Sequence, residues 1–257
     1  MAQSLSLIIY EYPLNERIRT WLRLEDLFGK ALFFIRASDH RSHHSALLAI
    51  FELTDVMTRP ELKSELLQEL ERQRCALEGL RSHAAVDHER LGEILERVSA
   101  SSQELHAMTR KLGQDIRDND WLMGIKSRAG IPGGVCSFDL PGYHFWLHVS
   151  PEQRRQDLLS WLGPSLPIRT AVEVVLTLLR EGGSISRQVA SSGVFQLTLG
   201  GRNAHMLRVG VDSEMPCAPE ASANKYAVNL RFTVVDKNQR PRTCEQDVPF
   251  ELTFCTL

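Results

Sequence analysis

The sequence lacks the long apolar runs, signal sequence and cysteine pairs that mark membrane or secreted proteins. No apolar run approaches the roughly 18 residues of a membrane span. The start, Met-Ala-Gln-Ser-Leu-Ser, does not have the charged-then-apolar order of a signal peptide. The five cysteines are odd in number and scattered, without a C-x-x-C pair, which is typical of reduced thiols. These absences predict a cytoplasmic protein with no membrane segment.

Signatures of catalysis and cofactor binding are also missing. Gly133-Gly134 does not stand in the G-x-x-x-x-G-K-[ST] frame of a phosphate loop, and no G-x-S-x-G turn occurs. His40, His43 and His44 have no Cys or carboxylate pair beside them, which favours a polar helix start over a metal site. We therefore expect no enzyme, no cofactor and no metal, with a hydrolase of dispersed active site as the remaining enzymatic alternative.

An excess of charge of one sign is absent as well. The 257 residues carry a formal net charge of −2, so the chain is not of the strongly cationic kind that binds nucleic acid by neutralising phosphates. The acidic excess lies between residues 61 and 120, where 13 acidic residues oppose 9 basic ones. The 43% apolar content is enough for a globular core.

Helical periodicity is present over most of the first two thirds of the chain. Residues 5–10 read as a short strand, after which Asn15 can cap a first helix. Further helices are predicted over 43–57 and near 151–162 and 168–180.

A long αα-hairpin is predicted over residues 61–112. Pro60 suits the start of its first helix, and Asp87 can cap the second after a break at 82–86. Both helices carry an apolar stripe at helical spacing. Such a hairpin either packs on its own domain or pairs with a second copy of the chain.

Short strands separated by Gly, Pro, Asn and Ser follow the last helix. They are predicted at 194–199, 206–211, 226–235 and 250–254. Helices followed by strands favour an α+β protein over a βαβ nucleotide fold. We predict a mainly helical domain over 14–182, with a strand near 143–149, and a smaller antiparallel β domain over 183–257. The strand at 5–10 is a candidate to join that β domain.

Turn residues and aromatics are concentrated between residues 131 and 148. Read as a strand, the end of this segment points His144, Trp146 and His148 to one face. Four strand residues would separate the two histidines by about 13 Å, too far for one metal ion. The face could cover a core or bind a peptide or nucleic acid.

Arginines stand close together on the predicted first helix. Arg19 and Arg23 are four residues apart, hence on one helix face, with Trp21 and Arg17 as neighbours. The spacing fits either a solvated helix face or a recognition surface.

Four motifs follow one another over more than half of the chain. They are YPLNERIRTWLRLE at 12–25, ELLQELERQ at 65–73, IPGG at 131–134 and CSFDLP at 136–141. Together they resemble the ZapD family, the Z-ring-associated cell division proteins of Gram-negative bacteria. The resemblance implies a cytoplasmic homodimer at the midcell division site. It would bind the C-terminal tail of FtsZ, a tubulin-like GTPase, and cross-link FtsZ protofilaments into bundles.

The resemblance also implies a basic pocket for that tail. The residues expected to bind it are Arg19, Arg23, Arg59, His144, Trp146, Lys225 and Arg231. Lys225 stands where the family pattern leads us to expect arginine, so the two-pronged contact of a guanidinium with a carboxylate would be lost there. A nucleic-acid-binding regulator that uses the arginines of the first helix is the alternative function, and the near-neutral charge argues against it.

Overall fold

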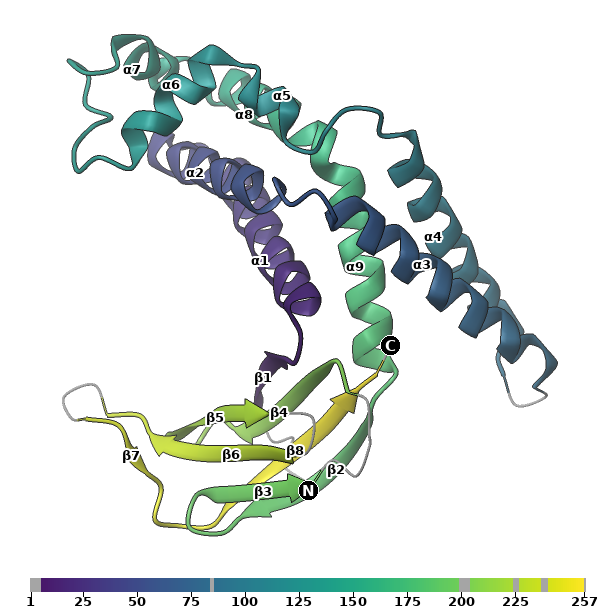
Figure 1. Ribbon diagram of the computed structural model, residues 1–257. Helices are drawn as coiled ribbons and strands as arrows, with labels where there is room; N and C mark the ends of the chain where they lie inside the picture. The colour runs from purple at the N-terminus through teal and green to yellow at the C-terminus, as the bar shows by residue number, and fades with distance from the viewer. Residues whose placement is uncertain (1–5, 84–85, 199–203, 224–226, 237–239, 257) are drawn as a thin grey trace. The chain divides into compact units, whose positions relative to one another are not determined.

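The computed structural model describes residues 6–83, 86–198, 204–223, 227–236 and 240–256 (Figure 1). The chain divides into two compact units. A β unit comprises residues 1–19 and 177–257, and a helical unit comprises residues 20–176. The chain is an α+β protein, as predicted, with helices first and antiparallel strands mostly afterwards.

Several of the helices begin where the sequence offers a capping side chain. Their bounds are α1 Glu16–Arg36, α2 His40–Val56, α3 Leu62–Gly79, α4 His88–Ala107, α5 Gln114–Arg117, α6 Asp120–Ala129, α7 Pro141–His148, α8 Pro151–Leu162 and α9 Leu166–Glu181. Asn15 accepts a hydrogen bond from the Ile18 amide at 2.9 Å, and Asp87 accepts from two amides of α4. Both predicted caps are therefore confirmed, because these side chains satisfy amides that have no partner within the helix.

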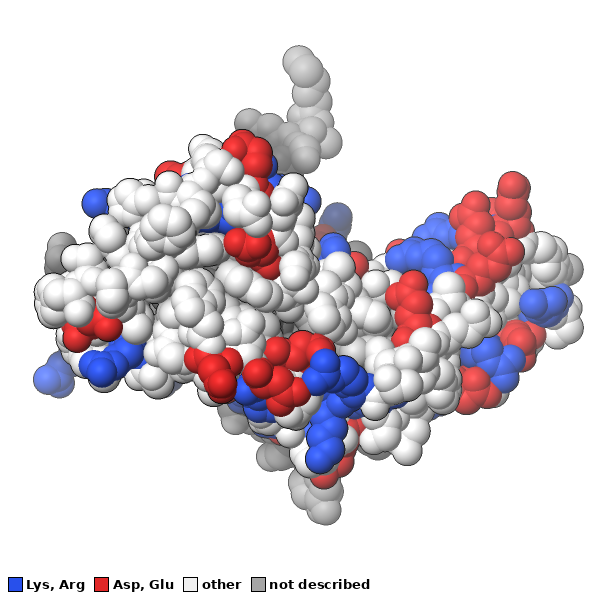
Figure 2. All heavy atoms as spheres, turned by 90° about the horizontal axis from the view of Figure 1, so that it is seen from above, with Lys and Arg blue, Asp and Glu red and all other residues white. Residues whose placement is uncertain are grey.

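Helices α3 and α4 form the predicted hairpin and lie side by side (Figure 1). Leu66 and Leu70 of α3 are fully buried, as is Leu105 of α4. Acidic and basic side chains alternate over the outer surface of this hairpin (Figure 2). The acidic excess seen in the sequence is thus a solvated surface.

The strands of the described residues form two antiparallel sheets in the β unit. One sheet has the order β1-β4-β8-β2, and the other has the order β3-β6-β5 with β7 paired to β6. Their bounds are β1 Leu7–Pro13, β2 Ser184–Ala190, β3 Val194–Thr198, β4 Met206–Asp212, β5 Cys217–Ala223, β6 Ala227–Val234, β7 Arg242–Thr243 and β8 Val248–Cys255. The N-terminal strand joins the C-terminal ones, with Ile9 opposite Gly210.

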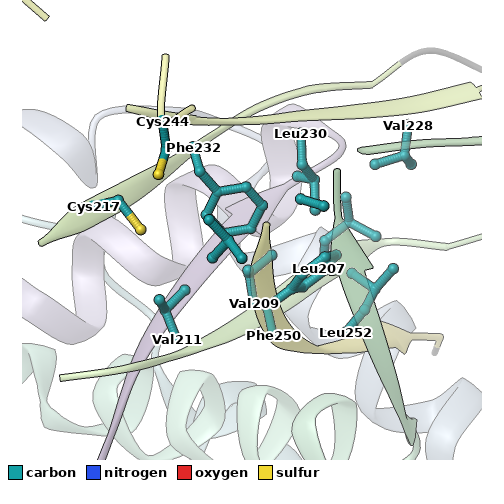
Figure 3. Close-up of a cluster of buried hydrophobic side chains, with 12 residues drawn as sticks. Leu207, Val209, Val211, Cys217, Val228, Leu230, Phe232, Cys244, Phe250 and Leu252 are labelled. Atoms are coloured by element: carbon teal, nitrogen blue, oxygen red, sulfur yellow. The ribbon is translucent and has the colours of Figure 1, made fainter. Parts of the chain in front are cut away.

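The core of the β unit lies between the two sheets (Figure 3). Val209 and Leu252 come from the first sheet, and Leu230 and Phe232 from the second. Phe250 packs its ring on Phe232 with centroids 5.0 Å apart. Alternate residues of each strand therefore supply this apolar layer, as expected for stacked sheets.

The predicted strand near 143–149 is wrong, because this segment is helix α7. Pro141 occupies the first turn of α7, where the missing amide hydrogen of proline costs nothing. Tyr143 and Trp146 are buried, three residues apart, which is helical rather than alternating spacing. The alternation of aromatic and polar residues in this segment is typical of a strand, but the burial of Tyr143 and Trp146 follows helical spacing.

Segment Pro151–Glu181, which includes α8 and α9, is long and apolar enough to cross a membrane by length and composition alone. Its most apolar window is 44% buried. Val172, Val175 and Leu176 of α9 are fully buried, and core helices of globular proteins pass the same test.

Candidate functional site

Three arginines lie close together where α1 begins and where the loop after α2 returns to it. Arg23 is exposed on α1, and Arg19 precedes it by one turn. Arg59, between α2 and α3, donates from Nη1 to the hydroxyl oxygen of Thr20 at 2.9 Å. Residues three apart are neighbours on a helix surface, so this bond holds Arg59 next to Arg23. We call Arg19, Arg23 and Arg59 the basic turn.

The opposite face of α1 fixes the orientation of the basic turn. Ile18, Trp21 and Leu24 are fully buried, at intervals of three residues. This spacing directs one face of the helix into the core. Arg19 and Arg23 are consequently held on the outer face.

The charges of the basic turn are accessible to a ligand. Arg19 forms an ion pair with Glu16 at 3.4 Å, with the two side chains 50% and 58% exposed. Exposed pairs of this kind contribute little to stability and exchange easily. Arg23 makes no hydrogen bond or ion pair with any other residue that the structure describes. The guanidinium group of Arg23 can therefore bind a carboxylate in two-pronged fashion.

A cavity of about 330 Å³ lies in the helical unit. Met57, which lines it, precedes Arg59 by two residues. Apolar side chains form much of its wall, including Ile50, Leu53 and Trp161. Lys111 also lines it and is exposed. This combination suits an apolar group that carries a carboxylate.

Trp146, expected at the binding surface, belongs to the core instead. It is 7% exposed, and its indole N–H donates to Asp157 at 2.8 Å. Its ring stacks on Tyr143 and packs on Trp161, with centroids 5.8 and 5.6 Å away. Burial raises the pKa of the Tyr143 hydroxyl. The cluster therefore anchors α7 and leaves His144 on its exposed face.

The structure does not bring His144 to the basic turn. Arg154 of α8 donates to the Leu147 carbonyl at the end of α7, at 2.9 Å, and to the Ser38 carbonyl just after α1, at 2.7 Å. His144 is thus near the C-terminal end of α1, whereas Arg23 is near its start. The 13 residues between Arg23 and Arg36 span about 20 Å of helix.

Arg231 lies in the β unit, on β6. Its guanidinium forms an ion pair with Glu220 of the neighbouring strand β5 at 2.7 Å, and both side chains are more than half exposed. Lys225 lies outside the described residues. Arg231 is therefore described with the β unit and is not part of the basic turn.

The residues that hold α7 in place were not found from the sequence. Arg154 is 5% exposed and donates from Nε to His43 Nδ1 at 2.9 Å. His43 in turn donates from Nε2 to the Ala37 carbonyl at 2.8 Å. Burial first, and the Arg154 charge in addition, lower the pKa of His43. The burial of Arg154 could not be predicted from the sequence, because an arginine in a charged helix normally faces solvent.

Among the residues with described positions, no group of three or more His, Cys, Asp or Glu is arranged to hold a metal ion.

Comparison with a family model and with known proteins points to the same family. The family model for ZapD, described as a cell division protein, matches residues 22–231. A protein of Dechloromonas aromatica named cell division protein ZapD is 52% identical over 252 residues, which cover 98% of this chain and all of that protein. The protein of that name from Aromatoleum aromaticum is 51% identical over 250 residues, or 97% and 98% of the two chains. The protein of that name from Nitrosomonas europaea is 47% identical over 253 residues, which cover 98% of this chain and 97% of that protein.

Proposed function

Since this chain belongs to the ZapD family of cell division proteins, we propose that it binds the C-terminal tail of FtsZ and, as a homodimer, cross-links FtsZ protofilaments into bundles. Its role in cell division follows from the family. Binding of the FtsZ tail, formation of a homodimer and bundling of protofilaments are what we propose in addition. The protein would act as a cytoplasmic adaptor at the midcell Z ring, without catalysis or a cofactor.

The basic turn is the observation that supports tail binding. A disordered tail loses conformational entropy when it binds, so a few strong contacts must fix it. Hydrogen bonds between guanidinium and carboxylate are of this kind. Arg23 presents an exposed guanidinium, with Arg59 held beside it through Thr20. Acidic residues on the tail would bind there.

Cross-linking requires two such sites in one particle. A symmetric dimer supplies them, because its two copies present identical surfaces. Once one tail is bound, the second binds at a high local concentration. Weak single contacts would thus suffice to hold two filaments together.

The direct test measures binding of a fluorescent FtsZ tail peptide by anisotropy. We expect Arg23→Ala to weaken binding at least tenfold, about 1.4 kcal/mol, as for a residue that carries much of the binding energy. Arg97→Ala is the matched control, because Arg97 is also an exposed helical arginine and lies on α4. Equal affinity of the Arg23 and Arg97 variants would contradict the proposed site.

A second pair of variants tests whether Arg59 acts through its position. Thr20→Val keeps the shape of the side chain but removes the oxygen that accepts from Arg59, so binding should weaken. Thr20→Ser keeps the oxygen, and binding should stay near that of the wild type. The same loss in both would show that packing of α1, and not the hydrogen bond, matters.

Bundling is tested by co-sedimentation with FtsZ and GTP. Intact FtsZ should pellet with the protein, whereas FtsZ without its C-terminal tail should not. Both binding and bundling should weaken as salt screens the charges. A DNA gel shift performed in parallel tests the nucleic-acid alternative, and a shift at physiological salt would favour it.

A further inference from the structure

Helix α7 places two exposed histidines one turn apart. His144 and His148 are four residues apart, and their ring centroids are 4.4 Å from each other. The strand once expected here would have put them about 13 Å apart, which excludes a common ligand. The helix removes that obstacle, because residues four apart lie on the same face.

The protonation of His148 is set by its own helix. Its Nδ1 lies 2.8 Å from the carbonyl oxygen of His144. A carbonyl oxygen only accepts, so Nδ1 must carry the hydrogen. In the neutral ring Nε2 then has a free lone pair. Histidines that bind metals commonly have this arrangement, in which the second ring nitrogen donates to a backbone carbonyl.

The ring spacing agrees with chelation of one ion. Metal–nitrogen distances near 2.0 Å place each ring centre roughly 3.2 Å from the ion. At ligand angles between square and tetrahedral, two ring centres are then about 4.5–5 Å apart. The observed 4.4 Å is close to this range, so small side-chain rotations would complete the geometry.

We infer that His144 and His148 form a two-histidine site for a borderline divalent transition metal such as Zn²⁺, Ni²⁺ or Cu²⁺. Imidazole nitrogen suits these ions, whereas Mg²⁺ and Ca²⁺ prefer oxygen ligands. Since the described residues contain no group of three ligands, water fills the other coordination positions. His40 stacks its ring on His148 at 6.1 Å and covers one side of the site. The site stands independently of the proposed tail binding.

The test is calorimetric titration of the full-length, untagged protein with ZnCl₂ and NiCl₂. We expect saturable binding of one ion, weakened at least tenfold in His148→Gln and in His144→Gln. His88→Gln and His106→Gln are matched controls, because both histidines are exposed on α4. They should bind like the wild type, and MgCl₂ should give no saturable signal.

Electron paramagnetic resonance with one equivalent of Cu²⁺ tests the ligands themselves. Nitrogen couplings from two imidazoles are expected in the wild type and from one in each single variant. Circular dichroism checks that the variants fold, and exposed positions should tolerate glutamine. The inference is overturned if the wild type shows no saturable binding, or if both α7 variants bind as tightly as the controls.

Discussion

Arg154 is the position where one substitution should most affect the helical unit. Its guanidinium connects three parts of the chain that are distant in sequence: the turn between α1 and α2, His43 of α2, and the turn between α7 and α8. It is 5% exposed. In Arg154→Met the side chain keeps much of its length but loses every donor.

The expected cost follows from the acceptors that are left. Carbonyl oxygens of Ser38, Leu147 and Val149 and the Nδ1 of His43 each lose their donor. A buried acceptor without a partner costs about 1–3 kcal/mol. Only the bond to His43 is buried, whereas the three bonds to carbonyl oxygens are part-buried. We therefore expect a loss of about 2–3 kcal/mol, which is still a large share of the roughly 5–15 kcal/mol that typically stabilises a protein.

Tryptophan fluorescence during urea unfolding measures this loss. The four tryptophans, Trp21, Trp121, Trp146 and Trp161, all lie in the helical unit. The signal therefore reports that unit without a contribution from the β unit. Multi-domain chains need not unfold in a single two-state transition. A separate transition of the β unit would not distort the free energy of unfolding that the tryptophans report for the helical unit.

Arg155→Met is the matched control. Arg155 donates to the carbonyl oxygens of Ile35 and Ala37, both at 3.3 Å. These longer bonds should contribute about 1 kcal/mol together. If Arg154→Met lowers the free energy of unfolding by no more than Arg155→Met does, the assigned role of Arg154 is refuted.

Three further results are expected. Burial lowers the pKa of His43 in the folded protein below its ordinary value of 6.5. The stabilising contribution of His43 is therefore complete above pH 6.5 and is lost as the pH falls toward the pKa that His43 has in the folded protein. The urea midpoints at pH 7.5 and 5.5 should differ less in His43→Gln than in the wild type. Cys75 and Cys136 are exposed and the other three cysteines buried, so a thiol reagent should modify two cysteines in the native protein and five in denaturant; more than two fast sites would contradict the β core. Gly193 has φ +71 and a Cβ there would lie 2.5 Å from a backbone oxygen, so Gly193→Ala should speed amide hydrogen exchange in β3 and β6, and unchanged exchange would exclude this strain.

The order of elements could be predicted because its signals are local. Asn15 and Asp87 cap helices where the sequence places them, and four predicted strands correspond to β3, β4, β6 and β8. Strands β2 and β5 were not predicted. Their Ser, Arg, Pro and Glu residues do not show strand patterning, and pairing with β8 and β6 made them strands.

The candidate site was predicted only in part, for a similar reason. Helical spacing relates Arg19 to Arg23, and the family resemblance names Arg59, but only the structure shows the hydrogen bond that connects Arg59 to Thr20 of the same helix. Trp146 was expected at the binding surface. Its burial depends on contact with Trp161 of another helix, and the local sequence does not reveal such a contact.

The amino-acid sequence by itself determined the fold class, the helix starts and the family, since each depends on residues close together in the chain. Tertiary structure decided that 141–148 is a helix, that β1 pairs with β4, and that a buried arginine connects three turns. These features depend on partners more than a hundred residues apart or on an aromatic cluster that packing assembles. The pairing energy that selects them exists only when the chain is folded.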